Sequence, residues 1–539
     1  MKVLVVGGGG REHAIIRKLK ESPRRPALYA APGNGGIASD AVCVPIAATD
    51  VAGVVSFAVQ EGIDYVVVAP DDPLVLGMVD ALAEKGIPAF GPNKAAAILE
   101  GSKVFSKNLM KKYGIPTAAY ETFADAGEAA AYVRANRKYP LVVKADGLAL
   151  GKGVLICEDE AAALAAVKSI MEDRQFGASG SRIVIEEFLT GPEVSVLSFT
   201  DGKTVVPMVS SMDHKRALDG DRGLNTGGMG TIAPNPYYTP QIAQVCMETI
   251  FKPTVAAMNA EGRPFKGCLY FGLMLTPDGP KVIEYNCRFG DPETQVVLPL
   301  LESDLLAVMQ AVTNGTLAQT EVKFSGQSAA CVVLASGGYP QHYEKGKPIT
   351  GLADGQLPGG GATVYHAGTA LADNVLVTSG GRVLIMPSGT HRAFSASTAI
   401  SRLPRPSTRS ACTSATLPAA FTRCTSPAML RMVPNRKNTT SHSLSSAAAR
   451  SCSFFTAAIT GQLAMRSLIC SKMQRSLSIG RPGKGATLTK IKQTKRSFTN
   501  LCSPGSFTHL NISIIADAAA SVKWGRGQKC KIGIFTKTV

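Results

Sequence analysis

The sequence predicts a multidomain protein that combines a parallel α/β unit with α+β units. Three observations support this prediction. The chain has 539 residues, of which 45% are hydrophobic, so it is too long for one compact core and contains enough apolar residues for several. Residues 1 to about 120 alternate short apolar runs with helical stretches, which is typical of a parallel sheet. Later apolar runs lie between glycine-rich turns, which favours α+β units.

Short apolar runs mark the strands that we expect along the chain. In the amino-terminal part they lie at residues 3–6, 65–69 and 87–90. A small α+β module follows, with expected strands at residues 141–144, 154–156 and 182–188. A larger α+β block contains expected strands at residues 267–272 and 281–286, and short strands with turns continue from about 328 to 384.

These segments divide the chain into four expected parts. They are an amino-terminal parallel α/β domain at 1–102, a central region at 103–322, a small β-rich domain at 323–384 and a tail at 385–539. Within the central region, we expect residues from about 120 to 190 to form a small subdomain, which the family resemblance described below implies is mobile.

The formal net charge of +17 arises from the end of the chain. Residues 391–539 contain 23 Lys and Arg but only one acidic residue, Asp517. Residues 1–390 contain 34 basic and 39 acidic residues, so they are mildly acidic. General attraction to polyanions therefore does not explain what the first 390 residues do, and we expect no specific nucleic-acid partner.

The tail differs from the rest of the chain in composition. Residues 391–539 contain 22 Ser, 17 Thr and six of the 12 Cys, without a helical or strand period. Two interpretations are open: a basic disordered extension that binds a polyanion, or a segment translated out of its proper reading frame. Cysteines and scattered apolar residues are unsuited to a disordered arm, which favours the second. We expect residues after about 385 to be unfolded or aberrant, without a function of their own.

The sequence also indicates where the protein works. No run approaches the roughly 18 apolar residues of a membrane-spanning helix, and the start of the chain lacks a secretory signal. The cysteines form no CxxC pair that would suggest a structural zinc site. These features predict a cytoplasmic protein that has no membrane partner and keeps its cysteines reduced.

A glycine run at residues 7–10 follows the first expected strand and precedes Arg11 and Glu12 at the start of a helix. Backbone N–H groups at such a turn hold phosphate. Gly7 and Gly9 fit the first two positions of a dinucleotide fingerprint, but Glu12 stands where the last glycine should be, so NAD binding is not expected. The run predicts a simple phosphate site, and a glycine turn needed only for packing is the alternative.

A second glycine-rich loop lies between two expected strands. Lys144 precedes this loop, and Gly151, Lys152 and Gly153 lie within it. A fixed ammonium group beside a mobile loop with another lysine suits a triphosphate. The loop is not a Walker A motif, because Lys152 is followed by glycine and the segment leads into a strand. A flexible β-hairpin without a ligand is the alternative.

A third candidate site lies on the expected strand at residues 281–286. Glu284 and Asn286 share one face of this strand, and Arg288 follows two positions later. A carboxylate and an amide oxygen suit Mg²⁺, which keeps the rest of its shell for waters and phosphates. The same alternation places Cys287 on the opposite face, where we expect a buried structural thiol. An exposed strand face without a function is the alternative.

Together these sites resemble those of the ATP-grasp superfamily, and one of its families in particular. Residues 288–295, Arg-Phe-Gly-Asp-Pro-Glu-Thr-Gln, are similar to the signature of the phosphoribosylamine–glycine ligases, also called glycinamide ribonucleotide synthetases. Other segments that resemble this family are 8–14, 31–36, 99–103, 213–216, 225–230 and 365–369. The resemblance extends from residue 1 to about 384.

The sequence departs from the family pattern in two places. Asp71 stands where the family often has a glutamate. We expect Asp71 to take the place of that glutamate with a shorter side chain. After residue 384 the family continues with a strand, a helix and a short carboxy-terminal end, whereas this chain continues into the basic tail. We expect a frameshift near residue 385 and hence an incomplete last domain.

The resemblance implies an ATP-grasp fold, with 103–322 as the ATP-grasp region, and an enzyme of purine synthesis. Its reaction is the ATP-dependent ligation of glycine to 5-phosphoribosylamine. The glycine carboxylate attacks the γ-phosphate to give glycyl phosphate and ADP, and the amine then displaces phosphate to form glycinamide ribonucleotide. The implied cofactors are ATP and Mg²⁺ or Mn²⁺, the implied partners are the two small substrates, and the expected state is a monomer.

The resemblance also implies roles for individual residues. Arg288, Asp213 and Lys144 are the implied catalytic residues, with Arg288 on the glycyl carboxylate and Asp213 on the glycine ammonium. The implied nucleotide contacts are Lys103, Lys144, Gly151, Lys152, Gly153, Glu186, Glu187, Phe188, Leu189 and Glu193, the last on the ribose. The implied contacts to 5-phosphoribosylamine are Gly9, Gly10, Arg11, Glu12, Gly33 and Asn34. Glu284 and Asn286 are the implied metal ligands.

Two alternatives remain open from the sequence. One is another ATP-grasp ligase that joins a different acid and amine. The other is a nonfunctional frameshifted product whose basic tail binds nucleic acid without specificity.

Overall fold

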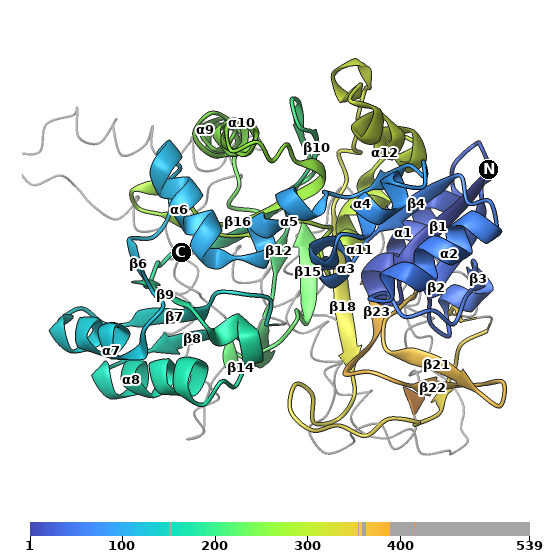
Figure 1. The fold of residues 1–539 in the computed structure, drawn as a ribbon. Coiled ribbons are helices and arrows are strands. Elements are labelled where there is room, and N and C mark those ends of the chain that lie inside the picture. Colours follow the sequence, from blue (N-terminus) through green and yellow to red (C-terminus); the bar gives the residue numbers. More distant parts are fainter. Residues whose placement is uncertain (150–152, 354, 358–362, 389–414, 417–539) are drawn as a thin grey trace, which may run out of the picture. The chain divides into compact units, whose positions relative to one another are not determined.

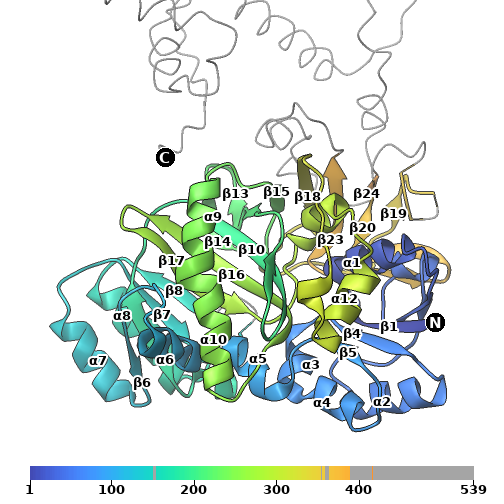
Figure 2. The same cartoon turned by 90° about the horizontal axis from the view of Figure 1, so that it is seen from above.

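The computed structural model describes residues 1–149, 153–353, 355–357, 363–388 and 415–416. All of them belong to one compact unit, which contains both helices and strands (Figures 1 and 2). The mixed α/β and α+β class is therefore confirmed for this part of the chain. Among these residues, no helix has the length and apolar character needed to span a membrane.

Five parallel strands form the first sheet, in the order β3-β2-β1-β4-β5. They are β1 (Lys2–Gly7), β2 (Ala27–Pro32), β3 (Val42–Cys43), β4 (Tyr65–Val68) and β5 (Ala89–Phe90). The helices of this part are α1 (Gly10–Lys20), α2 (Val51–Gln60), α3 (Asp71–Leu76), α4 (Met78–Ala83) and α5 (Lys94–Gly101), with the short turn η1 (Ile37–Ser39).

Helices cover both faces of this parallel sheet. Val3 and Val5 pack in the same core as side chains of α1, whereas Leu4 and Val6 pack with α2 and α4. Because both faces are covered, β1 carries a continuous apolar run instead of an alternating one. The expected strands at 3–6 and 65–69 are confirmed, and the one at 87–90 is shorter than expected.

The small module has an antiparallel sheet in the order β6-β9-β7-β8. Its strands are β6 (Tyr120–Phe123), β7 (Leu141–Ala145), β8 (Val154–Cys157) and β9 (Ile183–Glu187), and its helical segments are α7 (Ala126–Ala135), α8 (Glu160–Val167), η2 (Lys168–Glu172) and η3 (Gly177–Gly180). Both α7 and α8 lie on one face of the sheet (Figure 1). Leu141, Val143 and Ala145 point toward these helices, so Val142 and Lys144 point to the opposite face.

The central antiparallel sheet has the order β11-β10-β16-β17. Its strands are β10 (Glu193–Asp201), β11 (Val205–Pro207), β16 (Lys266–Thr276) and β17 (Gly279–Asn286). Its neighbours are α6 (Lys103–Tyr113), α9 (Pro240–Cys246), η4 (Met247–Phe251), α10 (Lys252–Ala260), α11 (Thr294–Val297), η5 (Leu298–Leu300), α12 (Leu305–Asn314) and η6 (Leu317–Gln319). The segments α9, η4 and α10 follow one another without a break and form one long rod (Figure 2).

A third large sheet joins two parts of the chain that the sequence analysis separates. Its order is β12-β15-β18-β23-β20, and all neighbours are antiparallel. The strands are β12 (Met212–Asp213), β15 (Gly230–Ala233), β18 (Ala329–Ala335), β20 (Tyr365–His366) and β23 (Arg382–Ser388). Hence strands before residue 322 and after residue 323 share one hydrogen-bonded sheet.

The remaining strands are short. They form the hairpins β13 (Arg216–Leu218) with β14 (Arg222–Asn225) and β21 (Thr369–Ala372) with β22 (Val375–Thr378), and the parallel pair β19 (Ile349–Thr350) with β24 (Ala415–Thr416). The ladder between β23 and β18 continues to Ser388, four residues beyond the boundary expected at 384. Ile385 is fully buried there and leaves no room for a side chain at Gly10.

Buried polar contacts connect the carboxy-terminal strands to the amino-terminal sheet. The backbone N–H of His366 donates to Nδ1 of His13 at 2.8 Å, so the other ring nitrogen of His13 donates to Asp40, at 3.0 Å. Asn34 donates to the carbonyls of Gly8 and His366, at 2.9 and 2.8 Å. Burial lowers the pKa of the His366 imidazole to about 4, so this interface holds a neutral ring.

We predict that the His366 imidazole contributes a loss of folding stability as the pH falls below about 6.5. The folded state has a pKa of about 4 at His366 against an ordinary 6.5, so the unfolded state binds the proton first and stability is lost between these two values. The loss from this one group is on the order of 3 kcal/mol. Urea unfolding at a series of pH values measures it.

His366→Gln should remove this contribution, because glutamine does not titrate. His342→Gln is the control, since His342 is exposed, and it should behave like the parent protein. If the free energy of unfolding of His366→Gln changes with pH as it does in the parent protein, the buried imidazole is not the titrating group.

Candidate active site

The lysine that the sequence places before the second glycine-rich loop is held by a buried carboxylate. Lys144 on β7 forms an ion pair with Glu186 on β9, and Glu186 also pairs with Lys107 of α6, with 2.5 Å between Nζ and Oε2. All three side chains are at most 5% exposed. Lys144 also donates to the carbonyl of Ile283 on β17, at 3.2 Å, which brings the two sheets into contact.

Charges that are buried this deeply affect one another strongly. Burial lowers the pKa of Lys107 to about 8, although Glu186 opposes this change. Burial alone would raise the pKa of Glu186, but Lys144 and Lys107 outweigh it and hold that pKa below its usual range. Glu186 therefore stays ionised between two ammonium groups. Lys107 was not singled out from the sequence, and its position one helical turn after Lys103 was the available signal.

Lys103 begins α6 and is tied to the start of the glycine-rich loop. Its Nζ donates to the carbonyl of Gly147 at 3.0 Å, and its backbone N–H donates to the carbonyl of Asp146 at 2.9 Å. The Asp146 carboxylate caps α6 through Ser102 and pairs with Arg182 at 2.6 Å. At the other end of the loop, the Gly153 carbonyl accepts from Ala145. Gly151 and Lys152 lie outside the described residues.

The segment expected to lie along the adenine follows β9. Glu187 pairs with the backbone of Ala119 through its own N–H and its carboxylate, each at 3.0 Å. Phe188 is 38% exposed and Leu189 is half-buried. Glu193 starts β10, where its carboxylate lies 3.1 Å from Nζ of Lys215.

The face that carries the expected metal ligands has the predicted alternation. Glu284, Asn286 and Arg288 are partly exposed, whereas Tyr285 and Cys287 between them are buried. Burial would raise the pKa of Glu284, but four cations, Lys215, Lys144, Lys103 and Arg288, hold it below its usual range. The carboxylate is therefore ionised.

Two observations test whether this face fits a divalent metal ion. Within the described residues, neither the Glu284 carboxylate nor the Asn286 amide has a hydrogen-bond or ion-pair partner, so both oxygens are free to coordinate. The same residues contain no cluster of three or more His, Cys, Asp or Glu that could hold a metal alone. A pair of oxygen ligands suits a metal that completes its shell with waters and substrate phosphates.

Arg288 lies at the end of this face and contacts two acids. Its Nη2 is 3.0 Å from Glu100 and 3.7 Å from Asp71, and its buried Nε has no partner. Burial raises the pKa of Glu100 to about 7, with Arg288 opposing the change. Asp71 therefore faces Arg288, and Glu100 is a contact that the sequence did not indicate.

Asp213, the residue expected to bind an ammonium group, lies at a small polar pocket. The pocket is lined in part by Glu193, Ser195, Asp213, Lys215, Tyr270 and Glu284. Oδ1 of Asp213 is buried without a partner. Burial and the nearby Glu293 raise the pKa of Asp213 to about 8. Glu293 itself accepts from Tyr270 at 3.1 Å and from Ser195 at 3.2 Å; it lies within the 288–295 segment but was not assigned a role.

Several amino-terminal residues are expected to bind 5-phosphoribosylamine. In this structure they make hydrogen bonds mainly to other residues of the protein. Glu12 accepts from the N–H of Gly9 at 2.6 Å and pairs with Arg11 at 2.7 Å. In this structure Glu12 therefore occupies the Gly9 N–H, and phosphate binding by the glycine run stays a prediction. Asn34 is likewise occupied by backbone carbonyls, as described above, and Gly33 adopts φ +72°, which favours glycine there.

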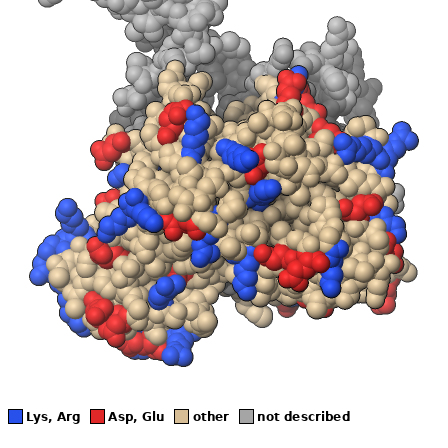
Figure 3. Space-filling model, turned by 45° about the horizontal axis from the view of Figure 1, so that its top comes forward, with Lys and Arg blue, Asp and Glu red and all other residues tan. Residues whose placement is uncertain are grey.

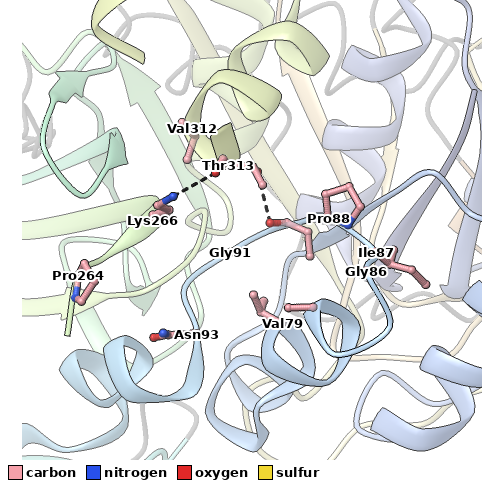
Figure 4. A pocket seen from close by; sticks show the side chains of 12 residues that line it. Val79, Gly86, Ile87, Pro88, Gly91, Asn93, Pro264, Lys266, Val312 and Thr313 are labelled. Carbon is pink, nitrogen blue, oxygen red and sulfur yellow. Dashed lines mark hydrogen bonds between the residues drawn. The ribbon is translucent and has the colours of Figure 1, made fainter. Parts of the chain in front are cut away.

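A larger cavity of about 480 Å³ lies away from these residues (Figure 4). It is lined by residues that include Val79, Ile87, Pro88, Pro264, Val312 and Thr313. Lys266 at this cavity donates to the carbonyl of Thr313, at 3.1 Å. None of the site residues predicted from the sequence lines it, so the smaller polar pocket is the candidate active site.

The glycine-rich loop between β7 and β8, and the lysines and acids gathered beside β17, define an ATP-grasp enzyme. Comparison with known families gives the same result. Residues 1–100, 101–294 and 329–403 match the N, ATP-grasp (A) and C domains of phosphoribosylglycinamide synthetase. The third match extends past residue 385, where the sequence analysis places the end of the family pattern. The chain belongs to the phosphoribosylglycinamide synthetase family.

Similar proteins carry a consistent name. The phosphoribosylamine–glycine ligase of Allochromatium vinosum is 50% identical over 387 residues, which are 71% of this chain and 90% of that protein. That of Agrobacterium fabrum is 50% identical over 384 residues, with the same coverage. The crystal structure of phosphoribosylamine–glycine ligase from Thermotoga maritima gives a TM-score of 0.64 at 35% identity, over 74% of this chain and 94% of that one. ATP-grasp ligases use ATP with a divalent metal.

We predict that Glu186→Gln destabilises the fold by roughly 3 kcal/mol, because it leaves two buried ammonium groups without their counter-ion. Denaturant unfolding of the full chain measures this change. Glu261→Gln is the matched control: Glu261 pairs with Lys112 at 2.6 Å, but Lys112 is exposed, so a much smaller loss of stability is expected. If the two substitutions lower the free energy of unfolding equally, the buried ion pairs of Glu186 do not stabilise the fold more than an exposed pair does.

Proposed function

We propose that this enzyme ligates glycine to 5-phosphoribosylamine with ATP, forming glycinamide ribonucleotide, ADP and phosphate in purine synthesis. The observation that carries the proposal is the set of four cations, Lys103, Lys144, Lys215 and Arg288, around the ionised Glu284. The names of the relatives supply the substrates. Another ATP-grasp ligase is not favoured, because relatives at 50% identity carry this one name.

The first step needs cations because it brings anions together. A glycine carboxylate that attacks the γ-phosphate is repelled by the phosphate oxygens, and Lys103 and Lys144 reduce this repulsion. Glu284 and Asn286 would hold Mg²⁺, or Mn²⁺, which supplies further neutralisation of phosphate oxygens. Lys144 is kept in place by Glu186, so little reorganisation is required when the nucleotide enters.

Glycine is assigned to the polar pocket and its rim. Asp213 accepts from the ammonium group, which satisfies its unpartnered Oδ1. Arg288 holds the carboxylate and then the acyl phosphate, and its unpartnered Nε supports this role. The amine of 5-phosphoribosylamine then attacks the acyl carbon of glycyl phosphate, and phosphate leaves.

The contacts to the rest of the substrates are also proposals. Glu187, Phe188 and Leu189 lie along the adenine, Glu193 accepts from the ribose hydroxyls, and the loop with Gly151, Lys152 and Gly153 covers the phosphates. Gly9, Gly10, Arg11, Glu12, Gly33 and Asn34 surround the 5-phosphoribosylamine. For Gly9, this requires the Glu12 carboxylate to release its N–H.

Further proposals concern the working form. We propose a cytoplasmic monomer, and the six described cysteines, which form no disulfide, suit a reducing compartment. On the face shown in Figure 3, Lys and Arg are interspersed with Asp and Glu, which does not favour a specific nucleic-acid partner. We also propose that the reading frame is shifted near residue 385, and translation of the coding DNA in the other two frames from that codon tests this.

Substrate dependence of ADP release tests the proposed reaction. We expect rapid ADP release only when glycine and 5-phosphoribosylamine are both present, because the acyl phosphate is consumed only by the amine. Coupled detection of ADP with each substrate alone, and with alanine in place of glycine, supplies the controls. Turnover with a different acid or amine, but not with this pair, would point to another ligase.

We predict that Glu284→Ala lowers kcat at least about 100-fold, because a charge that organises the phosphates is lost. Isothermal titration should also show that magnesium no longer strengthens nucleotide binding. Glu248→Ala, at an exposed Glu that pairs with Lys252, is the control and should retain activity. Normal turnover of the folded Glu284→Ala variant would rule out the metal assignment.

A further inference from the structure

We propose that Arg382 and Tyr339 are positioning residues that hold the glycine-rich loop 225–230 against Asp213 and thereby set the affinity for glycine. Both residues lie within the match to the C domain, and neither is among the site residues predicted from the sequence. The inference rests on the proposed function, because Asp213 is assigned to glycine there.

The two residues bind the backbone of the same residue, Gly227, one at its N–H and the other at its carbonyl. The N–H of Gly227 donates to the hydroxyl of Tyr339 at 3.0 Å, and its carbonyl accepts from Nη1 of Arg382 at 2.5 Å. The Arg382 guanidinium packs directly on Gly227, since a Cβ there would lie 3.0 Å from Cζ. A side chain at this position would push the guanidinium away from its present place by a few tenths of an ångström.

The following residue transmits this contact to the pocket. Gly228 adopts φ +105°, and a Cβ on it would lie 2.6 Å from Oδ1 of Asp213 and would also collide with Pro292. The loop is therefore packed between Arg382 on one side and Asp213 on the other. A shift of the loop 225–230 therefore changes the space around Oδ1 of Asp213, which has no hydrogen-bond partner.

Backbone hydrogen bonds fasten the segment 213–215 to the same loop. The N–H of Thr226 donates to the carbonyl of Lys215 at 2.8 Å, and the N–H of Met229 donates to the carbonyl of His214 at 2.9 Å. In the other direction, the N–H of His214 donates to the carbonyl of Gly230, at 2.9 Å. Asp213 and the loop consequently move together.

Charge supports the same role for Arg382. Nη1 also donates to the carbonyl of Asp291 at 2.9 Å and lies 3.4 Å from its carboxylate. Burial and Glu293 raise the pKa of Asp213, whereas Lys215 and Arg382 oppose this rise. The guanidinium therefore favours the ionised form of Asp213, which is the form that pairs with an ammonium group.

The sheet topology explains how Arg382, which lies far along the chain from Asp213, reaches this pocket. Arg382 is the first residue of β23, and Asp213 lies on β12 of the same sheet, with β15 and β18 between them (Figure 1). The carboxy-terminal strands thus complete the glycine site in addition to covering the core.

Tyr339→Phe tests the proposal, because it removes one hydroxyl and keeps the ring. We expect the KM for glycine to rise about fivefold, as for the loss of one hydrogen bond, while the KM for ATP changes less than about twofold. Tyr343→Phe is the matched control: its ring lies 6.1 Å from that of Tyr339, and within the described residues its hydroxyl has no hydrogen bond to the loop. We expect no change from it.

Arg382→Gln should raise the KM for glycine further, and Arg382→Lys should restore part of the loss because it returns the charge. A merely structural role would lower the unfolding midpoint without this selective rise. An unchanged KM for glycine in Tyr339→Phe, or equal rises for glycine and ATP, would overturn the proposal, even if Arg382→Gln fails to fold.

Asp213→Asn separates this inference from the proposed function. If Asp213→Asn raises the KM for glycine and Tyr339→Phe does not, the inference is wrong and the glycine assignment stands. If Asp213→Asn leaves that KM unchanged, the assignment of glycine to this pocket is itself wrong.

Discussion

Repulsion between like charges is the constraint on which the arrangement of this site depends. A site that brings a carboxylate to a triphosphate needs several cations close together, and such cations repel one another when water is excluded. Among the described residues, five cations of the site each have an acid beside them: Lys107 and Lys144 share Glu186, Lys215 pairs with Glu193, Arg288 with Glu100, and Arg382 with Asp291. Lys103 instead donates to the carbonyl of Gly147. The acids hold these cations in place and offset part of their positive charge.

The same need to pair charges explains which side chains lie on each face of the sheets. In the small module, alternate residues of β7 and β9 send apolar side chains toward α7 and α8, and the opposite face carries Lys144 and Glu186. On β17 the same period of two separates Glu284 and Asn286 from the buried Tyr285 and Cys287. Each sheet thus packs a core with one face and supplies charged groups with the other. The ion pairs and hydrogen bonds between these polar faces bring the groups together.

The shared sheet places residues 329–388 in contact with the other parts of the protein. Residues 329–388 pair with strands from residues 212–233, and Ile385 packs on the turn at Gly10. This part therefore touches both the amino-terminal turn and the loop beside Asp213. Division into consecutive domains, which follows the order of the chain, does not capture a sheet assembled from distant segments.

The sequence by itself determined the class of fold, most strands, the glycine turns and the face that carries Glu284, Asn286 and Arg288. All of these depend on patterns within a few residues, which the backbone geometry of a strand or turn imposes directly. Only the tertiary structure decided that Lys107 shares Glu186, that Glu100 meets Arg288, that Glu12 occupies the Gly9 N–H, and that Arg382 reaches Gly227. Except for the bond between Glu12 and Gly9, these contacts join residues far apart in the chain, and their partners are chosen by how sheets pack and by how buried charge is neutralised.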